Sequence, residues 1–149
     1  MASSPIPDEL IRNGRSANQN FAQTEQFFFR FHKLDAGKVP IQSIRCPDQS
    51  TNRSQYCLNH EWVLLPNYQG WGVAALMFRD LPAAMTTSGK VRFEFGAVHD
   101  PQENNYSHTE LSVIKNSIRV RSQSKINDQI RLEYRMAIAN RLLLLKNPS

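Results

Sequence analysis

Apolar and polar residues alternate with the two-residue period of a β-strand in two segments of the chain. The first covers residues 27–33, where one side of the strand carries Phe27, Phe29 and Phe31 and the other carries Phe28, Arg30 and His32. The second covers residues 90–99, where one side carries Val91, Phe93, Phe95 and Ala97. Both predict strands with one apolar face, and phenylalanines gathered on one face are more typical of a buried core than of a base-stacking surface.

Shorter apolar runs predict the remaining strands at residues 39–44, 62–65, 72–78, 108–115 and 118–121. Asn116-Ser117 has the residue types of a hairpin turn between the last two of these. Residues 46–60 contain almost no apolar side chain and predict a long exposed loop. Residues 81–89 and 100–107 predict connections between strands.

The last part of the chain changes to the period of an amphipathic helix, with an apolar stripe made of Ile126, Ile130, Tyr134, Ala137, Ile138, Leu142 and Leu145. The stripe predicts one helix that begins near Ser124, the expected N-cap, and ends before Pro148. Leu143 and Leu144 fall off the stripe. We expect them to contact either a further part of the sheet or another protein chain.

Together these elements predict an α+β fold: an antiparallel sheet of five to seven strands with a C-terminal amphipathic helix packed on it. Residues 1–24 are rich in Ser, Asn, Gln and Pro and predict a flexible or loosely docked N-terminal arm. Residues 25–149 then form a single α+β domain, which agrees with a length of 149 residues.

Composition narrows the class of protein. Apolar residues make up 40% of the chain, enough to build a core, yet no apolar run approaches the roughly 20 residues of a membrane span. We therefore expect no membrane association. The first residues lack the basic start and apolar stretch of a secretory signal, which predicts a cytoplasmic location.

The net charge of +5 is concentrated near the C-terminus, where residues 115–149 carry eight basic and two acidic side chains. Such asymmetry favours an anionic partner, of which nucleic acid is the commonest. Arg131, Arg135 and Arg141 on the predicted helix are the candidate contacts, and Arg131 and Arg135 are expected to face outward. A solvated basic helix face is the alternative interpretation.

Two polar segments, residues 45–60 and 99–110, contain the candidate site residues. We expect a pocket in which Arg53, Tyr56 and Asn105 bind a ligand while His99, His108 and Glu110 supply general acid and base groups. A guanidinium makes paired hydrogen bonds to phosphate, so this set predicts a phosphate-bearing ligand. Ordinary turn and strand-end hydrogen bonds are the alternative role for the same residues.

Strand geometry tests this pocket. If residues 91–99 and 108–115 form a hairpin with their apolar residues on one face, Phe95 pairs with a residue such as Leu111. His108 and Glu110 then lie on the face opposite His99. Only a β-bulge would bring both histidines to one side.

Metal binding is the weaker hypothesis. Cys46, Cys57 and His60 lack the closely spaced cysteine pair of most structural zinc sites, so we expect two reduced cysteines, no metal and no cofactor. The sequence also lacks the phosphate-loop, dinucleotide, zincin and EF-hand motifs.

Two functional hypotheses follow. The first is a small intracellular protein whose His/Arg/Asn pocket binds or acts on a nucleotide or nucleic acid. This hypothesis leaves open whether the protein is an enzyme. The second is a noncatalytic interaction or assembly subunit whose basic C-terminal helix docks on a protein or nucleic acid, or which forms a homo-oligomer.

Overall fold

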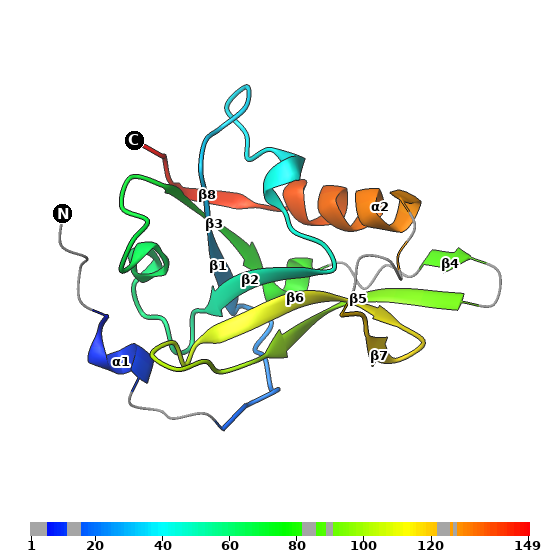
Figure 1. The fold of residues 1–149 in the computed structure, drawn as a ribbon, viewed down its shortest axis with the longest axis horizontal. Helices are drawn as coiled ribbons and strands as arrows, with labels where there is room; N and C mark the ends of the chain where they lie inside the picture. The colour runs from blue at the N-terminus through cyan, green and yellow to red at the C-terminus, as the bar shows by residue number, and fades with distance from the viewer. Residues whose placement is uncertain (1–5, 12–15, 82–85, 89–90, 122–125, 127) are drawn as a thin grey trace.

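The chain folds into an antiparallel sheet with one long helix against it (Figure 1). The computed structural model describes residues 6–11, 16–81, 86–88, 91–121, 126 and 128–149. The helices and 3-10 turns are α1 (Asp8–Ile11), η1 (Ile41–Ser43), η2 (His60–Leu64), η3 (Phe78–Asp80) and α2 (Asp128–Ala139). The strands are β1 (Gln26–Phe31), β2 (Asp48–Arg53), β3 (Gly72–Met77), β4 (Thr86–Ser88), β5 (Val91–His99), β6 (His108–Lys115), β7 (Ile118–Arg119) and β8 (Leu143–Lys146).

The strands follow the order β4-β5-β6-β2-β1-β3-β8, and β7 adds to β6. This arrangement confirms the predicted α+β fold with a helix near the C-terminus. Asn116 and Ser117 both have positive φ, 50° and 69°, as a tight hairpin turn between β6 and β7 requires. Within the described residues, no helix combines the length and apolar character needed to span a membrane.

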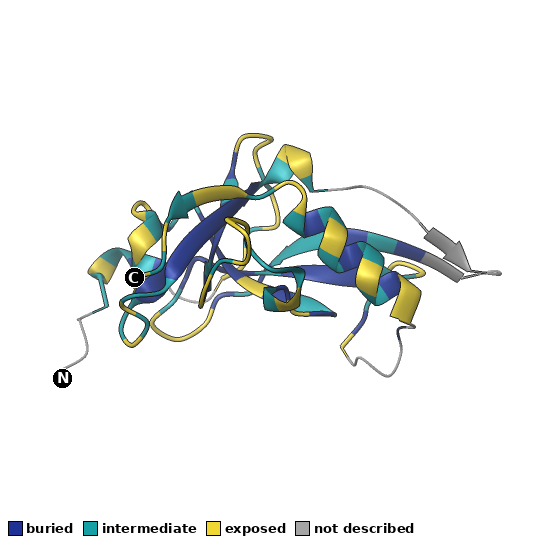
Figure 2. Cartoon of the chain, turned by 90° about the horizontal axis from the view of Figure 1, so that it is seen from above, coloured by how far each residue is buried: buried dark blue, intermediate teal, exposed yellow. Residues whose placement is uncertain are grey.

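One face of the sheet carries the larger core. Phe27, Phe29 and Phe31 of β1 are buried there with Phe93 and Phe95 of β5, as the alternation predicts. Helix α2 covers this face with its own buried stripe, Ile130, Tyr134 and Ile138, and Figure 2 shows the stripe along the helix. The Tyr134 hydroxyl donates to the carbonyl of Leu111 in β6, which anchors the helix to the sheet. We call this side the helix face.

The opposite face has a smaller core, formed by Phe28 of β1, Val73 and Ala75 of β3, and side chains from η2 and α1. Val63 and Leu64 of η2 and Leu10 of α1 are the covering residues. We call this side the open face, because its cover consists of short turns and leaves part of β1 and β2 beside a cavity.

Strand β2 corrects the sequence prediction most strongly, because residues 46–60 were expected to be an exposed loop. Asp48–Arg53 instead lies between β1 and β6, near the middle of the sheet. Its sequence, DQSTNR, has no apolar residue, yet Gln49, Thr51, Asn52 and Arg53 are buried. Their polar groups are hydrogen-bonded, as in Thr51 Oγ1 to the Thr109 carbonyl at 2.7 Å, so burial does not leave them unsatisfied.

Two further predicted strands are short 3-10 turns. The apolar residues at 39–44 and 62–65 belong to segments that contain η1 and η2. Short apolar runs do not distinguish strand from helix, and Asn59 caps η2 by accepting a hydrogen bond from the Glu61 amide at 3.0 Å.

The C-terminal helix is shorter than predicted. It ends at Ala139, and Leu143–Lys146 forms β8, which pairs with β3 at the edge of the sheet. Leu142 and Leu145 therefore do not continue the helix stripe. Leu143 and Leu144 were expected to contact either a further part of the sheet or another chain. Their backbone pairs with β3 of the sheet, but their side chains are 55% and 40% exposed. The expected N-cap, Ser124, lies outside the described residues.

Candidate functional site

The strand register places the two candidate histidines on opposite faces of the sheet. His99 pairs with Thr109, and Phe95 pairs with Val113 rather than with Leu111. The register differs from the expected one by two residues, which leaves the facing unchanged. His108 pairs with Asn52, which pairs with Phe28 on the open face, whereas Arg53 pairs with Phe27 on the helix face. The six predicted site residues are therefore not one pocket.

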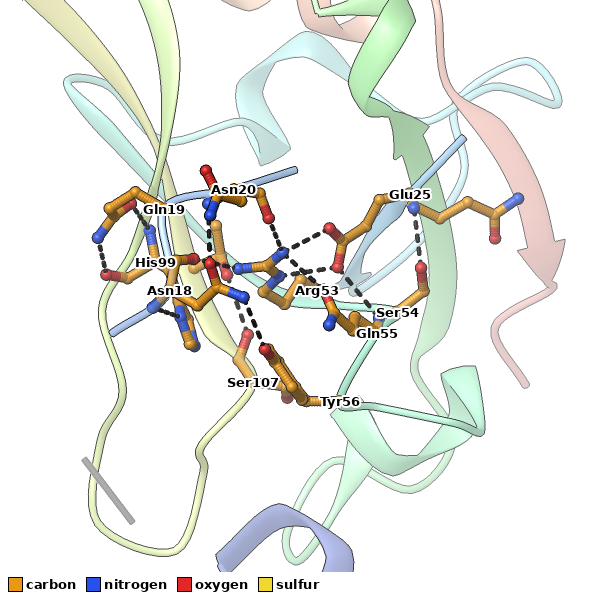
Figure 3. A network of polar contacts seen from close by, with 12 residues as sticks. Asn18, Gln19, Asn20, Glu25, Arg53, Ser54, Gln55, Tyr56, His99 and Ser107 are labelled. Atoms are coloured by element: carbon orange, nitrogen blue, oxygen red, sulfur yellow. Dashed lines mark hydrogen bonds and ion pairs between the residues drawn. The ribbon is translucent and has the colours of Figure 1, made fainter. Parts of the chain in front are cut away.

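Arg53 is fully buried, with 0% of its side chain exposed. Its Nε and Nη2 atoms donate to the two carboxylate oxygens of Glu25 at 2.8 and 2.7 Å (Figure 3). Its remaining donors reach the carbonyls of Asn18 and Asn20 and the side chain of Gln55. Every guanidinium nitrogen thus has a partner within the protein, so Arg53 holds the chain together and presents no charge to a ligand.

His99 is part of the same network. The Asn18 amide donates to His99 Nδ1 at 2.9 Å, and Nε2 lies 2.7 Å from the Tyr106 carbonyl, to which it donates in the neutral form. The Tyr56 ring stacks on the imidazole at 5.5 Å, and its hydroxyl accepts from Asn18. His99, Tyr56 and Arg53 therefore dock residues 18–20 of the predicted N-terminal arm onto the sheet, as Figure 3 shows.

Burial lowers the pKa of His99 below its ordinary value of 6.5, and the nearby Arg53 charge acts in the same direction. Protonation would also replace the acceptor at Nδ1 with a donor facing the Asn18 amide. The neutral imidazole is the form that fits this position.

His108 has a different environment on the open face. Nδ1 lies 2.8 Å from the Asp100 carbonyl, and Nε2 lies 2.8 Å from Ser50 Oγ and 3.2 Å from Glu110 Oε1. Burial alone would lower the pKa of His108, but the hydrogen bonds to Glu110 and Asp100 and their negative charges raise it above 6.5. Asn105 lies close by and accepts from Asn52 Nδ2 at 2.9 Å. Asn105, His108 and Glu110 therefore form one cluster on the open face, and Arg53, Tyr56 and His99 form a separate one.

A cavity of about 520 Å³ lies beside His108. It is lined by β1, β2, η1, η2 and the turns that follow these two, the loop between β5 and β6, and the start of β6. Its basic lining residues are Arg30, His32, Arg45 and His108. Among the described lining residues there is no aspartate or glutamate. The cavity is therefore a positively charged recess of the size that small-molecule sites have.

Aromatic rings form another wall of this cavity. Arg30 lies over the Tyr68 ring, 3.7 Å from its centroid, and Trp71 packs against both Tyr68 and His32 at 5.1 Å. No sequence pattern identified Tyr68, Trp71 or Arg45 as site residues. The sequence did place Arg30 and His32 on a common face, because the alternation at 27–33 puts both on the side opposite the three core phenylalanines.

The two cysteines lie in separate cores, Cys46 on the helix face and Cys57 on the open face. They do not come together with His60, whose ring instead packs against Phe28 at 6.0 Å. Burial raises the pKa of Cys46 to about 11 and of Cys57 to about 12, so both thiols stay protonated at neutral pH.

The helix arginines do not form an exposed basic stripe. Arg135 is half-buried and donates to the Ile44 carbonyl at 2.8 Å, which corrects the expectation that it faces outward. Arg131 is also half-buried and pairs with Asp128 at 3.1 Å. Arg141 was expected on the helix but lies two residues beyond the end of α2, where it is exposed and donates to the Ala137 carbonyl.

Comparison with known proteins does not assign the chain to a group: no family model, curated protein or solved structure matches it. The residues of the chain itself are therefore the basis for inferring its function.

Replacing Arg53 with methionine should lower the free energy of unfolding by about 3–5 kcal/mol, because Glu25 would remain buried without its partner. Urea denaturation measures this loss. The control is Arg119→Met, which removes a partly exposed pair with Asp48 and should cost about 1 kcal/mol or less. Equal losses in the two variants would contradict the structural role of Arg53.

The lowered pKa of His99 predicts a pH dependence of stability. Below about pH 6.5 the unfolded state binds a proton that the folded state resists, so the free energy of unfolding should fall from pH 7 toward pH 5. His99→Gln should reduce this slope. His108 contributes in the opposite direction in both proteins, so the difference between the two denaturation profiles isolates His99. An unchanged slope in the variant would contradict the account.

Proposed function

We propose that the chain binds nucleotide units, with single-stranded nucleic acid as the preferred form, in the cavity on the open face. The observation that carries this proposal is the cavity lining, which combines two arginines and two histidines with aromatic rings and contains no carboxylate among the described residues. This combination suits a ligand that carries both negative charge and planar bases.

Each part of a nucleotide has a matching group in the cavity. Arg30 and Arg45 suit phosphate oxygens, which guanidinium groups bind with paired hydrogen bonds. Trp71 and the Arg30–Tyr68 stack offer flat surfaces for a base. The side-chain amides of Asn52, Asn105, Gln49 and Gln102 also line the cavity and suit the polar edges of bases.

The shape of the open face favours a strand over a single free nucleotide. A second cavity of about 260 Å³ shares Arg30, Asn52, Val63 and Asn105 with the first. A ligand that follows both cavities would be longer than one nucleotide. The proposal concerns binding alone, because His99, the second expected catalytic histidine, lies on the opposite face.

Fluorescence anisotropy with a short labelled single-stranded RNA tests this proposal. We expect Arg30→Ala and Arg45→Ala each to weaken binding roughly tenfold and to reduce the salt dependence by about one phosphate contact. The matched control is Arg141→Ala, which removes an exposed arginine just after the end of α2 and should leave the affinity nearly unchanged. Competition with a mononucleotide distinguishes a strand site from a free-nucleotide site.

The proposal fails if the labelled RNA does not bind, or if Arg30→Ala and Arg141→Ala have equal effects. Melting curves of the variants separate lost contacts from lost folding. Binding that is lost only in Arg141→Ala would favour the helix instead.

A second candidate function, assembly with another copy of the chain, is favoured by one observation. Strand β8 lies at the sheet edge and exposes Leu143 and Leu144, and an edge strand offers unpaired backbone groups to another strand. The basic helix itself does not support this function, since Arg131 and Arg135 are held against the protein.

Sedimentation velocity tests this second candidate. If β8 pairs with a second copy, the wild type should form a dimer and Leu144→Ser should shift it toward monomer. Leu132→Ser is the control, because Leu132 is similarly exposed, at 49%, but belongs to α2 rather than to β8. A monomeric wild type at high concentration would contradict the assembly function.

A further inference from the structure

We propose that Asp100, His108 and Glu110 form a binding site for a divalent transition-metal ion, zinc above all. Within the described part of the chain, these residues are the group of His, Cys, Asp or Glu side chains whose ligand atoms all lie within 4.8 Å of one another. Two of them come from β6, where they face the same side, and Asp100 directly follows β5.

The hydrogen bond at Nδ1 prepares His108 to act as a ligand. A backbone carbonyl can only accept, so the Asp100 carbonyl at 2.8 Å requires a proton on Nδ1. In the neutral ring Nε2 then carries the lone pair. Metal-binding histidines commonly donate their other ring nitrogen to a carbonyl or carboxylate in this way, which fixes the tautomer and the ring orientation.

Nε2 and Glu110 Oε1 are two acceptors that face each other at 3.2 Å. Nε2 of the neutral ring can accept from the Ser50 hydroxyl at 2.8 Å, whereas a proton that makes His108 an imidazolium, or a metal ion, would join Nε2 and Oε1 directly. In a tetrahedral zinc site with bonds of about 2.0–2.2 Å, neighbouring ligand atoms lie about 3.3–3.6 Å apart. The separation of the His108 and Glu110 atoms is therefore close to that of two ligands on one ion, and the Asp100 carboxylate lies within 4.8 Å of both.

The second carboxylate oxygen of Glu110 gives an independent argument. Oε2 is buried and has no hydrogen-bond partner among the described residues. A proton shared between Nε2 and Oε1 leaves this oxygen unsatisfied, at the cost that buried polar atoms carry. A metal ion bound by the carboxylate neutralises the charge on both oxygens.

The chemical types of the three ligands indicate which metal ion the site would prefer. One imidazole nitrogen with two carboxylates suits zinc or manganese, whereas calcium and magnesium prefer an all-oxygen set and copper(I) prefers sulfur. Ser50 Oγ, 2.8 Å from Nε2, is exposed to the cavity side and lines the cavity with His108. The ion would therefore lie at the edge of the cavity, although the site stands whether or not the cavity binds nucleotides.

Titration calorimetry with zinc chloride, on protein freed of metal by a chelator, tests the site. We expect one zinc ion per chain, and at least tenfold weaker binding in Glu110→Gln and in Asp100→Asn. Asp100→Asn keeps the backbone carbonyl that holds Nδ1, so it tests the carboxylate alone. Glu103→Gln is the matched control, since Glu103 is an exposed carboxylate in the same loop.

The melting temperature with and without zinc distinguishes lost zinc binding from lost folding. Zinc should raise the melting temperature of the wild type and of Glu103→Gln, but not that of a folded Glu110→Gln or Asp100→Asn variant. Cobalt(II), used as a probe, should give visible absorption bands of a low-coordinate site in the wild type. The proposal is overturned if the wild type binds no zinc, or if Glu110→Gln and Asp100→Asn bind it as tightly as Glu103→Gln.

Discussion

The buried charge of Arg53 is the constraint on which the arrangement of the sheet depends. A guanidinium with no exposed surface must be neutralised and must have all its donors satisfied, and Glu25 with the carbonyls of Asn18 and Asn20 meets both conditions. These partners precede β1 in sequence, whereas Arg53 ends β2. The ion pair therefore fixes the segment before β1 against the end of β2, and the register of β1 on β2 follows from it.

That register divides the sheet into faces with different roles. Arg53, which pairs with Phe27, lies on the helix face and belongs to the structural network. Asn52, which pairs with Phe28, lies on the open face. Because short turns cover the open face incompletely, polar side chains of β2 and β6 border a cavity there. His99 and His108 are only one strand position apart across the hairpin, yet the first stabilises the fold and the second is left for ligand chemistry.

Apolar periodicity was enough to predict the sheet, the presence of the helix and the facing of the hairpin strands, since burial of one face decides these features. It did not predict β2, because a polar strand between two others is stabilised by hydrogen bonds and an ion pair that leave no apolar pattern. It extended the helix past Ala139, because Leu142 and Leu145 keep helical spacing inside a segment that turns back to pair with β3. The predicted site divides into two clusters because His99 and His108 face opposite sides of the sheet, and in the cluster around Arg53 the guanidinium is paired with Glu25, which is distant in sequence.

The central claim is that the open face binds the ligand while the network around Arg53 is structural. Nuclear magnetic resonance of the isotope-labelled protein, titrated with a short single-stranded RNA, tests it residue by residue. The account predicts shifts of amide signals in β1, β2 and the turn that carries Tyr68 and Trp71, with small shifts around His99 and Arg53. Shifts confined to α2 and β8, or centred on Arg53, would contradict it.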